Sequence, residues 1–279
     1  MKAPEFDYHR PDTLQAALEI LANTEDAAPL AGGQSLMPMM NFRLARPEAL
    51  VDLNHLPELA EVTVDGGHIH IGAMMRYADL AGNAEVQRHL PLMIRAIPHI
   101  AHSAIRNRGT IGGSCALADP AAEMPALLLA LDARITIRHR AGQSQEQAQD
   151  FFIGPYETAL SPDGAIIEKI QVPIPAPQRI GFHEIARRRG DYAMAGVAVA
   201  ASEDLSAVRI AFFGVADRAL RAEAAEAALA GSNGGSEALA DAIAALNDIP
   251  FAADLHTEAT TKRHLAGVAL RRAWTEVMA

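Results

Sequence analysis

Several features are scarce in this chain, and each scarcity excludes a class of protein. The 279 residues contain a single cysteine, Cys115, which excludes an internal disulfide and an all-cysteine iron–sulfur cluster. One cysteine also fits a reducing cytoplasm. No stretch reaches about 18 uninterrupted apolar residues, so we expect no membrane span. The first ten residues contain no apolar signal core. We therefore expect a cytoplasmic protein, and attachment to the inner face of the membrane stays open.

Basic residues are also fewer than acidic residues. Lysine and arginine number 24 against 34 acidic residues, a net charge of -10, which argues against nucleic acid as a partner. The Gly-x-Gly-x-x-Gly and Gly-x-x-x-x-Gly-Lys signatures of nucleotide-binding folds are missing. Gly33 and Ser35 match part of a nucleophile elbow, but Met37 stands where that motif requires glycine.

The histidines do not form a persuasive metal site. His68 and His70 share a strand face, and His99 and His102 share a helical face. No third ligand stands at a suitable spacing, so we expect structural or surface histidines and no metal. Cys115 has no activating base beside it in the sequence, which favours packing over nucleophilic work.

Half of the residues are apolar, enough for a sizeable core, and their periodicity predicts a mixed α and β chain. Helical spacing occurs over residues 13–23, 85–100, 120–132, 218–230 and 260–278. Strands are expected at residues 49–53, 134–139, 165–172, 182–188, 195–202 and 208–215, with a hairpin over 62–71. Three prolines within residues 173–177 predict a stiff linker between two domains.

Two glycine-rich segments, about eighty residues apart, are the most informative feature. Each has a pair of glycines followed closely by a small polar residue: Gly32, Gly33 and Ser35, then Gly112, Gly113 and Ser114. Glycine allows a ligand to approach the backbone closely, and successive N–H groups form a nest for an anion. Two such nests predict a clasp around a pyrophosphate, and hence a dinucleotide.

The two segments resemble the FAD-binding motifs of the flavoprotein (medium) subunit of molybdenum hydroxylases. This family includes the carbon monoxide dehydrogenase medium subunit and the FAD domain of xanthine dehydrogenase. The resemblance rests on residues 31–35, 106–114, 118–120, 123–126 and 187–193, in that order. It implies an α+β fold: a two-lobed PCMH-type FAD-binding domain over residues 1–175, with lobes of about 1–56 and 57–175. A small C-terminal α/β domain, an antiparallel sheet with helices, is expected over residues 176–279.

The resemblance also implies the cofactor site. The FAD-binding set that we expect comprises Leu30, Ala31, Gly32, Gly33, Gln34, Ser35, Leu36, Arg106, Asn107, Gly109, Thr110, Ile111, Gly112, Gly113, Ser114, Asp119, Glu123, Ile167, Asp191 and Tyr192. Plainer interpretations stay open for some of them.

Asp119 suits the N-cap of a helix beginning near Pro120, and Glu123 suits its first turn. Arg106 and Asn107 are also typical of a solvated basic turn. Many relatives carry a lysine just before residues 187–193, where this chain has His183 and Glu184, so the tuning of the flavin stays open.

The implied function is an electron relay with no catalytic acid–base pair in this chain. A large subunit with molybdopterin would oxidise the substrate, and a small subunit with two [2Fe–2S] clusters would pass electrons to FAD. The flavin would reduce an external acceptor, and the assembly would be a dimer of heterotrimers. A standalone FAD-dependent oxidoreductase and a flavin-free scaffold subunit are the alternatives. The substrate and the acceptor (quinone, cytochrome, oxygen or NAD) stay open.

Overall fold

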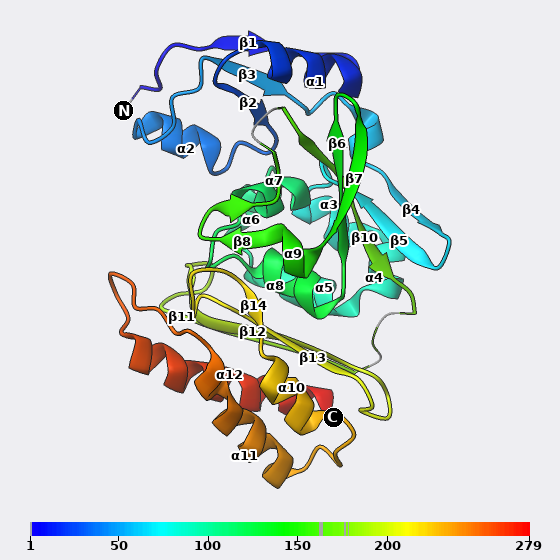
Figure 1. The fold of residues 1–279 in the computed structure, drawn as a ribbon, viewed down its shortest axis with the longest axis vertical. Coiled ribbons are helices and arrows are strands. Elements are labelled where there is room, and N and C mark those ends of the chain that lie inside the picture. The colour runs from blue at the N-terminus through cyan, green and yellow to red at the C-terminus, as the bar shows by residue number, and fades with distance from the viewer. Residues whose placement is uncertain (1, 162–163, 176, 178) are drawn as a thin grey trace.

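The computed structural model describes residues 2–161, 164–175, 177 and 179–279. Its elements are stacked along the long axis: a small N-terminal lobe, a larger middle lobe and a C-terminal layer (Figure 1). The described residues form sheets in the orders β1-β3-β2, β4-β5-β10-β6-β7 and β11-β12-β13-β14, with a small β8-β9 pair. The predicted mixture of helices and antiparallel strands is confirmed. Of the predicted linker, Ala176 lies outside the described residues.

The N-terminal lobe is a three-stranded parallel sheet with one packed helix. Strands β1 (Asp7–His9) and β2 (Ala27–Leu30) both pair with β3 (Ala49–Asp52). Helix α1 (Leu14–Asn23) begins where Thr13 Oγ1 accepts a hydrogen bond from the Ala16 N–H at 3.1 Å. Its apolar face packs on β3, as the spacing predicted. Because β2 ends at Leu30, this sheet delivers the first glycine segment at its carboxyl edge, followed by α2 (Leu36–Asn41).

The middle lobe is built on a five-stranded antiparallel sheet. Its strands are β4 (Val62–Asp65), β5 (His68–Gly72), β10 (Ile166–Pro173), β6 (Arg134–His139) and β7 (Gly142–Gln147). The helices are α3 (Tyr77–Gly82), α4 (Ala84–His89), α5 (Pro91–Ala96), α6 (Ser103–Arg106), α7 (Ile111–Leu117), α8 (Glu123–Ala130) and α9 (Ala148–Phe151). Residues 85–100 have a helical pattern in which Pro91 and Pro98 are expected to start, kink or end turns, and Pro91 does start a new helix, α5.

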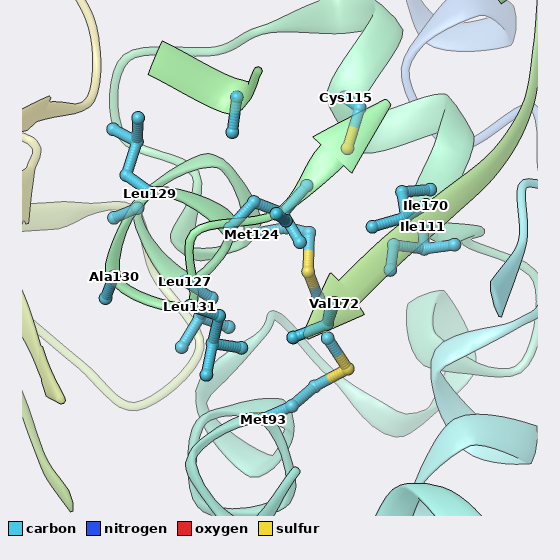
Figure 2. Close-up of a cluster of buried hydrophobic side chains, with 14 of the residues drawn as sticks. Met93, Ile111, Cys115, Met124, Leu127, Leu129, Ala130, Leu131, Ile170 and Val172 are labelled. Atoms are coloured by element: carbon cyan, nitrogen blue, oxygen red, sulfur yellow. The ribbon is translucent and has the colours of Figure 1, made fainter. Parts of the chain in front are cut away.

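Helix α8 occupies the centre of the molecule. From Met124 to Ala130 all of its residues are buried, which is typical of a helix covered on every side. Figure 2 shows Met124 near Met93 and Val172, with Cys115 in the same core. All four side chains are 0% exposed, so Cys115 has a packing role, as expected. Burial raises the pKa of its thiol, which keeps it in the unreactive neutral form.

The C-terminal layer is an antiparallel sheet with helices on its outer face (Figure 1). Its strands are β11 (Arg179–Ala186), β12 (Ala193–Ala201), β13 (Val208–Phe213) and β14 (Leu220–Arg221). Its helices are α10 (Glu223–Leu229), α11 (Ser236–Ala245) and α12 (Ala259–Val277). The inner face joins the middle lobe in one core that includes Phe182 and Phe213. The helix expected over residues 218–230 was placed too early, because Leu220 and Arg221 form the edge strand β14 and the helix begins at Glu223.

Candidate functional site

A cavity of about 610 Å³ lies where the two N-terminal lobes meet the turn between β11 and β12. Its walls come from the first glycine segment, α2, α7, the turn before α8, the start of β10 and residues 190–192. This volume lies within the roughly 300–1,000 Å³ that ligand pockets occupy. Residues widely separated in the sequence therefore build one pocket.

The first glycine segment presents free backbone donors to this cavity. The N–H groups from Gly32 to Ser35 donate to no other group among the described residues. Gly33 has a φ of +69°, a conformation that glycine adopts without strain. Gln34 braces the turn by donating its side-chain N–H to the Gly32 carbonyl at 3.0 Å. Successive unpaired N–H groups beside a cavity are the arrangement of an anion-binding nest, and anion binding by this segment stays a prediction.

The second glycine segment is organised differently from the expected nest. Thr110 is the N-cap of α7, and Gly112, Gly113 and Ser114 lie inside that helix. Their N–H groups are already used: Gly112 donates to the Ala73 carbonyl at 2.8 Å, and Gly113 to Thr110 Oγ1 at 3.1 Å. Ser114 donates to the Thr110 carbonyl at 3.2 Å. The segment therefore serves the pocket as a closely packed helical turn and not as a second set of free donors.

Glycine is required here because backbones meet. A Cβ on Gly32 would lie 2.2 Å from the Arg108 carbonyl oxygen and 2.9 Å from the Gly109 Cα. A Cβ on Gly112 would lie 2.5 Å from the Ala73 Cβ. All three distances are far below van der Waals contact. The glycine pairs thus let the two lobes touch and place α7 against the middle lobe's core.

The acidic residues stand just after α7, and the expected helix start near Pro120 is wrong. The N-cap of α8 is Ala122. Asp119 instead stabilises the preceding turn, where its Oδ1 accepts from the Ala121 N–H at 2.8 Å and its Oδ2 accepts from Tyr156 Oη at 3.4 Å. Glu123 lies in the first turn of α8, as predicted.

Glu123 has an unusual protonation state. Burial, and secondarily the charge of Asp119, raises the pKa of Glu123 to about 7. A carboxyl group that is partly protonated at neutral pH both donates and accepts hydrogen bonds, which suits it to a ligand hydroxyl.

Most of the expected site residues line the cavity. These are Ala31, Gly32, Gly33, Gln34, Ser35, Leu36, Gly109, Thr110, Gly112, Gly113, Ser114, Asp119, Glu123, Ile167, Asp191 and Tyr192. Asp191 and Tyr192 reach it from the C-terminal layer, and Tyr192 stays 70% exposed at the rim.

Four expected residues lie outside the cavity wall: Leu30, Arg106, Asn107 and Ile111. Ile111 is 0% exposed in the core, and Leu30 is the last residue of β2. Arg106 donates to the carbonyls of Ile100 and Ala101, both at 2.9 Å. It therefore holds a segment that does line the cavity, whereas Asn107 ends α6.

Part of the cavity wall could not be predicted from the sequence. Met39, Leu53, Tyr77, Ile100, His102 and Leu160 line the cavity, and none belongs to a recognisable motif. Only the fold brings them together. Tyr77 is 4% exposed, and burial raises the pKa of its phenol, so it stays neutral.

The cavity's chemistry fits FAD. Free N–H donors suit phosphate oxygens, a partly protonated carboxyl suits hydroxyl groups, and apolar walls such as Ile167 and Leu160 suit an aromatic ring system.

Among the described residues, no three His, Cys, Asp or Glu side chains gather as metal ligands. His70 instead pairs with Asp65 at 2.9 Å. In the described part of the chain, no helix has the length and apolarity to cross a membrane.

Known proteins share this architecture. Residues 4–175 match the family described as the FAD binding domain in molybdopterin dehydrogenase, and residues 180–277 match the CO dehydrogenase flavoprotein C-terminal domain. The nicotine 6-hydroxylase medium subunit of Paenarthrobacter nicotinovorans is 38% identical, over 99% of this chain and 98% of its own. The carbon monoxide dehydrogenase medium chain of Hydrogenophaga pseudoflava is 39% identical, over 98% and 97%.

Solved structures agree. A chain of carbon monoxide dehydrogenase from Hydrogenophaga pseudoflava superposes with a TM-score of 0.95 at 39% identity, covering 100% of this chain and 99% of that one. A chain of quinoline 2-oxidoreductase from Pseudomonas putida 86 gives 0.94 at 36% identity, covering 99% and 98%. The chain therefore belongs to the family of FAD-binding medium subunits of molybdenum hydroxylases, and it is a subunit of an oxidoreductase.

Proposed function

We propose that this chain holds FAD in the cavity between its two lobes and relays electrons from an iron–sulfur small subunit to an external acceptor. A molybdopterin large subunit would oxidise the substrate, and the assembly would be a dimer of heterotrimers in the cytoplasm. The observation that carries the proposal is the row of free N–H groups from Gly32 to Ser35 at the cavity wall.

The residues would divide the work of holding the cofactor. The backbone from Gly32 to Ser35 would bind the pyrophosphate, and the turn at Thr110–Ser114 would pack against it from the other lobe. Asp119 and Glu123 would meet sugar or ribityl hydroxyls. Tyr192, 70% exposed at the rim, would lie at the open edge where electrons enter or leave.

When bound, FAD accepts two electrons and passes them on, which is chemistry that no side chain supplies. This chain would contribute the fixed position of the ring and the local charge and hydrogen bonds that set its reduction potential. Accordingly, no catalytic acid–base pair is assigned to it.

Relatives of similar length support the proposal that this chain works together with partner subunits. The chain covers 97–98% of medium subunits whose names describe them as parts of larger enzymes. This favours a relay subunit over a standalone flavoenzyme. The free donors at the cavity argue against a flavin-free scaffold.

The test is purification of the native assembly through a tag on this chain. We expect one large and one small partner, with flavin, iron and molybdenum in the ratio 1:4:1, because each small subunit would carry two [2Fe–2S] clusters. Flavin without partners would instead indicate a standalone flavoenzyme, and partners without flavin would indicate a scaffold.

A further inference from the structure

One oxygen of a buried carboxyl group has no hydrogen-bond partner among the described residues, and the group lies beside His99, the residue before the cavity-lining Ile100. Glu184 belongs to β11, opposite Gly196 of β12, and its side chain is 4% exposed. Its Oε2 atom makes no hydrogen bond with any of the described residues. Leaving a carboxylate oxygen buried and unpaired is costly, so a native structure that keeps one calls for an explanation.

His99 connects this group with the solvent. Its Nδ1 lies 3.8 Å from Glu184 Oε2, which is beyond hydrogen-bond distance. The His99 side chain is 43% exposed, and its ring lies 5.1 Å from that of Phe182, two residues before Glu184. The imidazole thus stands between a buried acid and water, with one neutral acceptor nitrogen available for proton exchange.

The charges around Glu184 favour its neutral form. Burial, followed by the charge of Glu123, raises the pKa of Glu184 to about 8. Burial and the cation of Arg189 lower the pKa of His99, which Glu276 opposes. Near pH 8 the two groups are therefore not a fixed ion pair: His99 is neutral, and Glu184 is divided between its neutral form and a carboxylate that can still take up a proton.

The other charged groups near Glu184 do not supply a cation that would stabilise its carboxylate. Glu123, on α8, lines the flavin cavity and is itself influenced by Asp119. Neighbouring His183 pairs with Arg272 of α12 at 3.0 Å. Glu123 lines the cavity and its charge acts on Glu184, so we expect further negative charge in the cavity to raise the proton affinity of Glu184 as well.

We propose that Glu184 is a redox-linked proton site: it takes up a proton through His99 when the flavin cavity gains negative charge and releases it when that charge leaves. This inference rests on the proposed function. Two electrons come from the iron–sulfur partner, or from dithionite in the test. One proton comes from water and forms the Glu184 O–H bond, and reoxidation returns it to water. Glu184 would neither carry electrons nor contact the cofactor, and its protonation would respond only to the charge in the cavity.

The experiment is reduced-minus-oxidised infrared difference spectroscopy of the native complex at pH 8, with redox titrations from pH 6 to pH 10. Wild type should gain a protonated-carboxyl band on reduction, and its midpoint potential should show an inflection in slope near pH 8. Glu184→Gln should lose both features. Glu25→Gln, at an exposed position, should keep both.

A second variant tests the role of His99, and an isotope label identifies the band without any substitution. His99→Gln should keep the band at equilibrium but form it at least several-fold more slowly. Labelling the wild type with ¹³C-glutamate should shift the band even if Glu184→Gln does not fold. A band that survives Glu184→Gln, or fails to shift with the label, overturns this inference while leaving flavin binding intact. A wild-type complex without flavin overturns the proposed function as well.

Discussion

Gly32 of the N-terminal lobe lies against the backbone of Arg108 in the middle lobe so closely that a Cβ would stand 2.2 Å from the Arg108 carbonyl oxygen. The two glycine segments are therefore one structural unit, although about eighty residues separate them. Of the first pair, Gly33 supplies the left-handed turn and Gly32 supplies the contact between lobes. We therefore expect flavin binding and lobe packing to be coupled through this contact.

Replacing Gly32 by alanine tests this coupling. The Cβ meets backbone, which cannot swing aside, so the lobes must separate. We expect a stability loss of roughly 1–3 kcal/mol from overpacking and a flavin content reduced several-fold. Gly82→Ala is the matched control, because nothing lies within 4 Å of its Cβ. Flavin content and thermal unfolding measure both effects, and a Gly32→Ala variant with wild-type flavin would refute the coupling.

Two threonine N-caps separate stability from flavin binding. Thr110 Oγ1 accepts the Gly113 N–H beside the cavity, and Thr13 Oγ1 accepts the Ala16 N–H in α1. Alanine at either position should cost about 1 kcal/mol, because a helix N–H loses its acceptor. Only Thr110→Ala should also release flavin, and Thr110→Ser should restore it. Equal flavin loss in both alanine variants would point to general destabilisation instead.

Flavin affinity should depend on pH through Glu123. Its pKa is raised to about 7, so the group ionises between pH 6 and pH 8 and places negative charge beside an anionic cofactor. We expect the dissociation constant to rise about three- to tenfold over this range, within the roughly tenfold per pH unit that one proton allows. Glu123→Gln should bind with a nearly constant Kd. Titration by flavin fluorescence gives the curves, and identical pH profiles in both proteins would dismiss the assignment.

Stability should fall as pH rises because of Glu184. Its pKa is about 8 in the folded chain against an ordinary value of 4.5, so folding binds protons between these limits. The contribution is fully present below pH 4.5 and is lost as pH rises through about 8. Glu184→Gln should therefore raise Tm at pH 8 by about 2–4 °C, equivalent to roughly 1 kcal/mol, and by almost nothing at pH 5. Calorimetry at both pH values checks this, and a gain of equal size at pH 5 would contradict it.

Local signals in the sequence predicted much of the fold. The helix at α1 was predicted from its apolar spacing after Pro11 and Asp12, and the hairpin of β4 and β5 from alternation around two glycines. Failures occurred where tertiary packing outweighs local pattern. Leu220 and Arg221 look helical but extend a sheet edge, and α7 was hidden because its glycines are typical of a loop.

The site was predictable only where a motif carried it. The glycine segments and residues 119–123 are recognisable as motifs in the sequence, and the structure brings most of them to one cavity. Tyr77, His102 and Leu160 reach the same wall through topology alone. Glu184 was noticed only as a departure from relatives, and no sequence pattern could show that its carboxyl is buried beside His99.

The most direct test of the account is the flavin content of the native complex, measured as FAD released per copy of this chain, for wild type and for Gly33→Val. Valine strongly disfavours the φ of +69° that Gly33 adopts in the segment lining the cavity. We expect close to one FAD per wild-type chain and almost none in the variant, with both partner subunits still bound. Equal FAD in the two proteins would contradict the claim that this segment holds the cofactor.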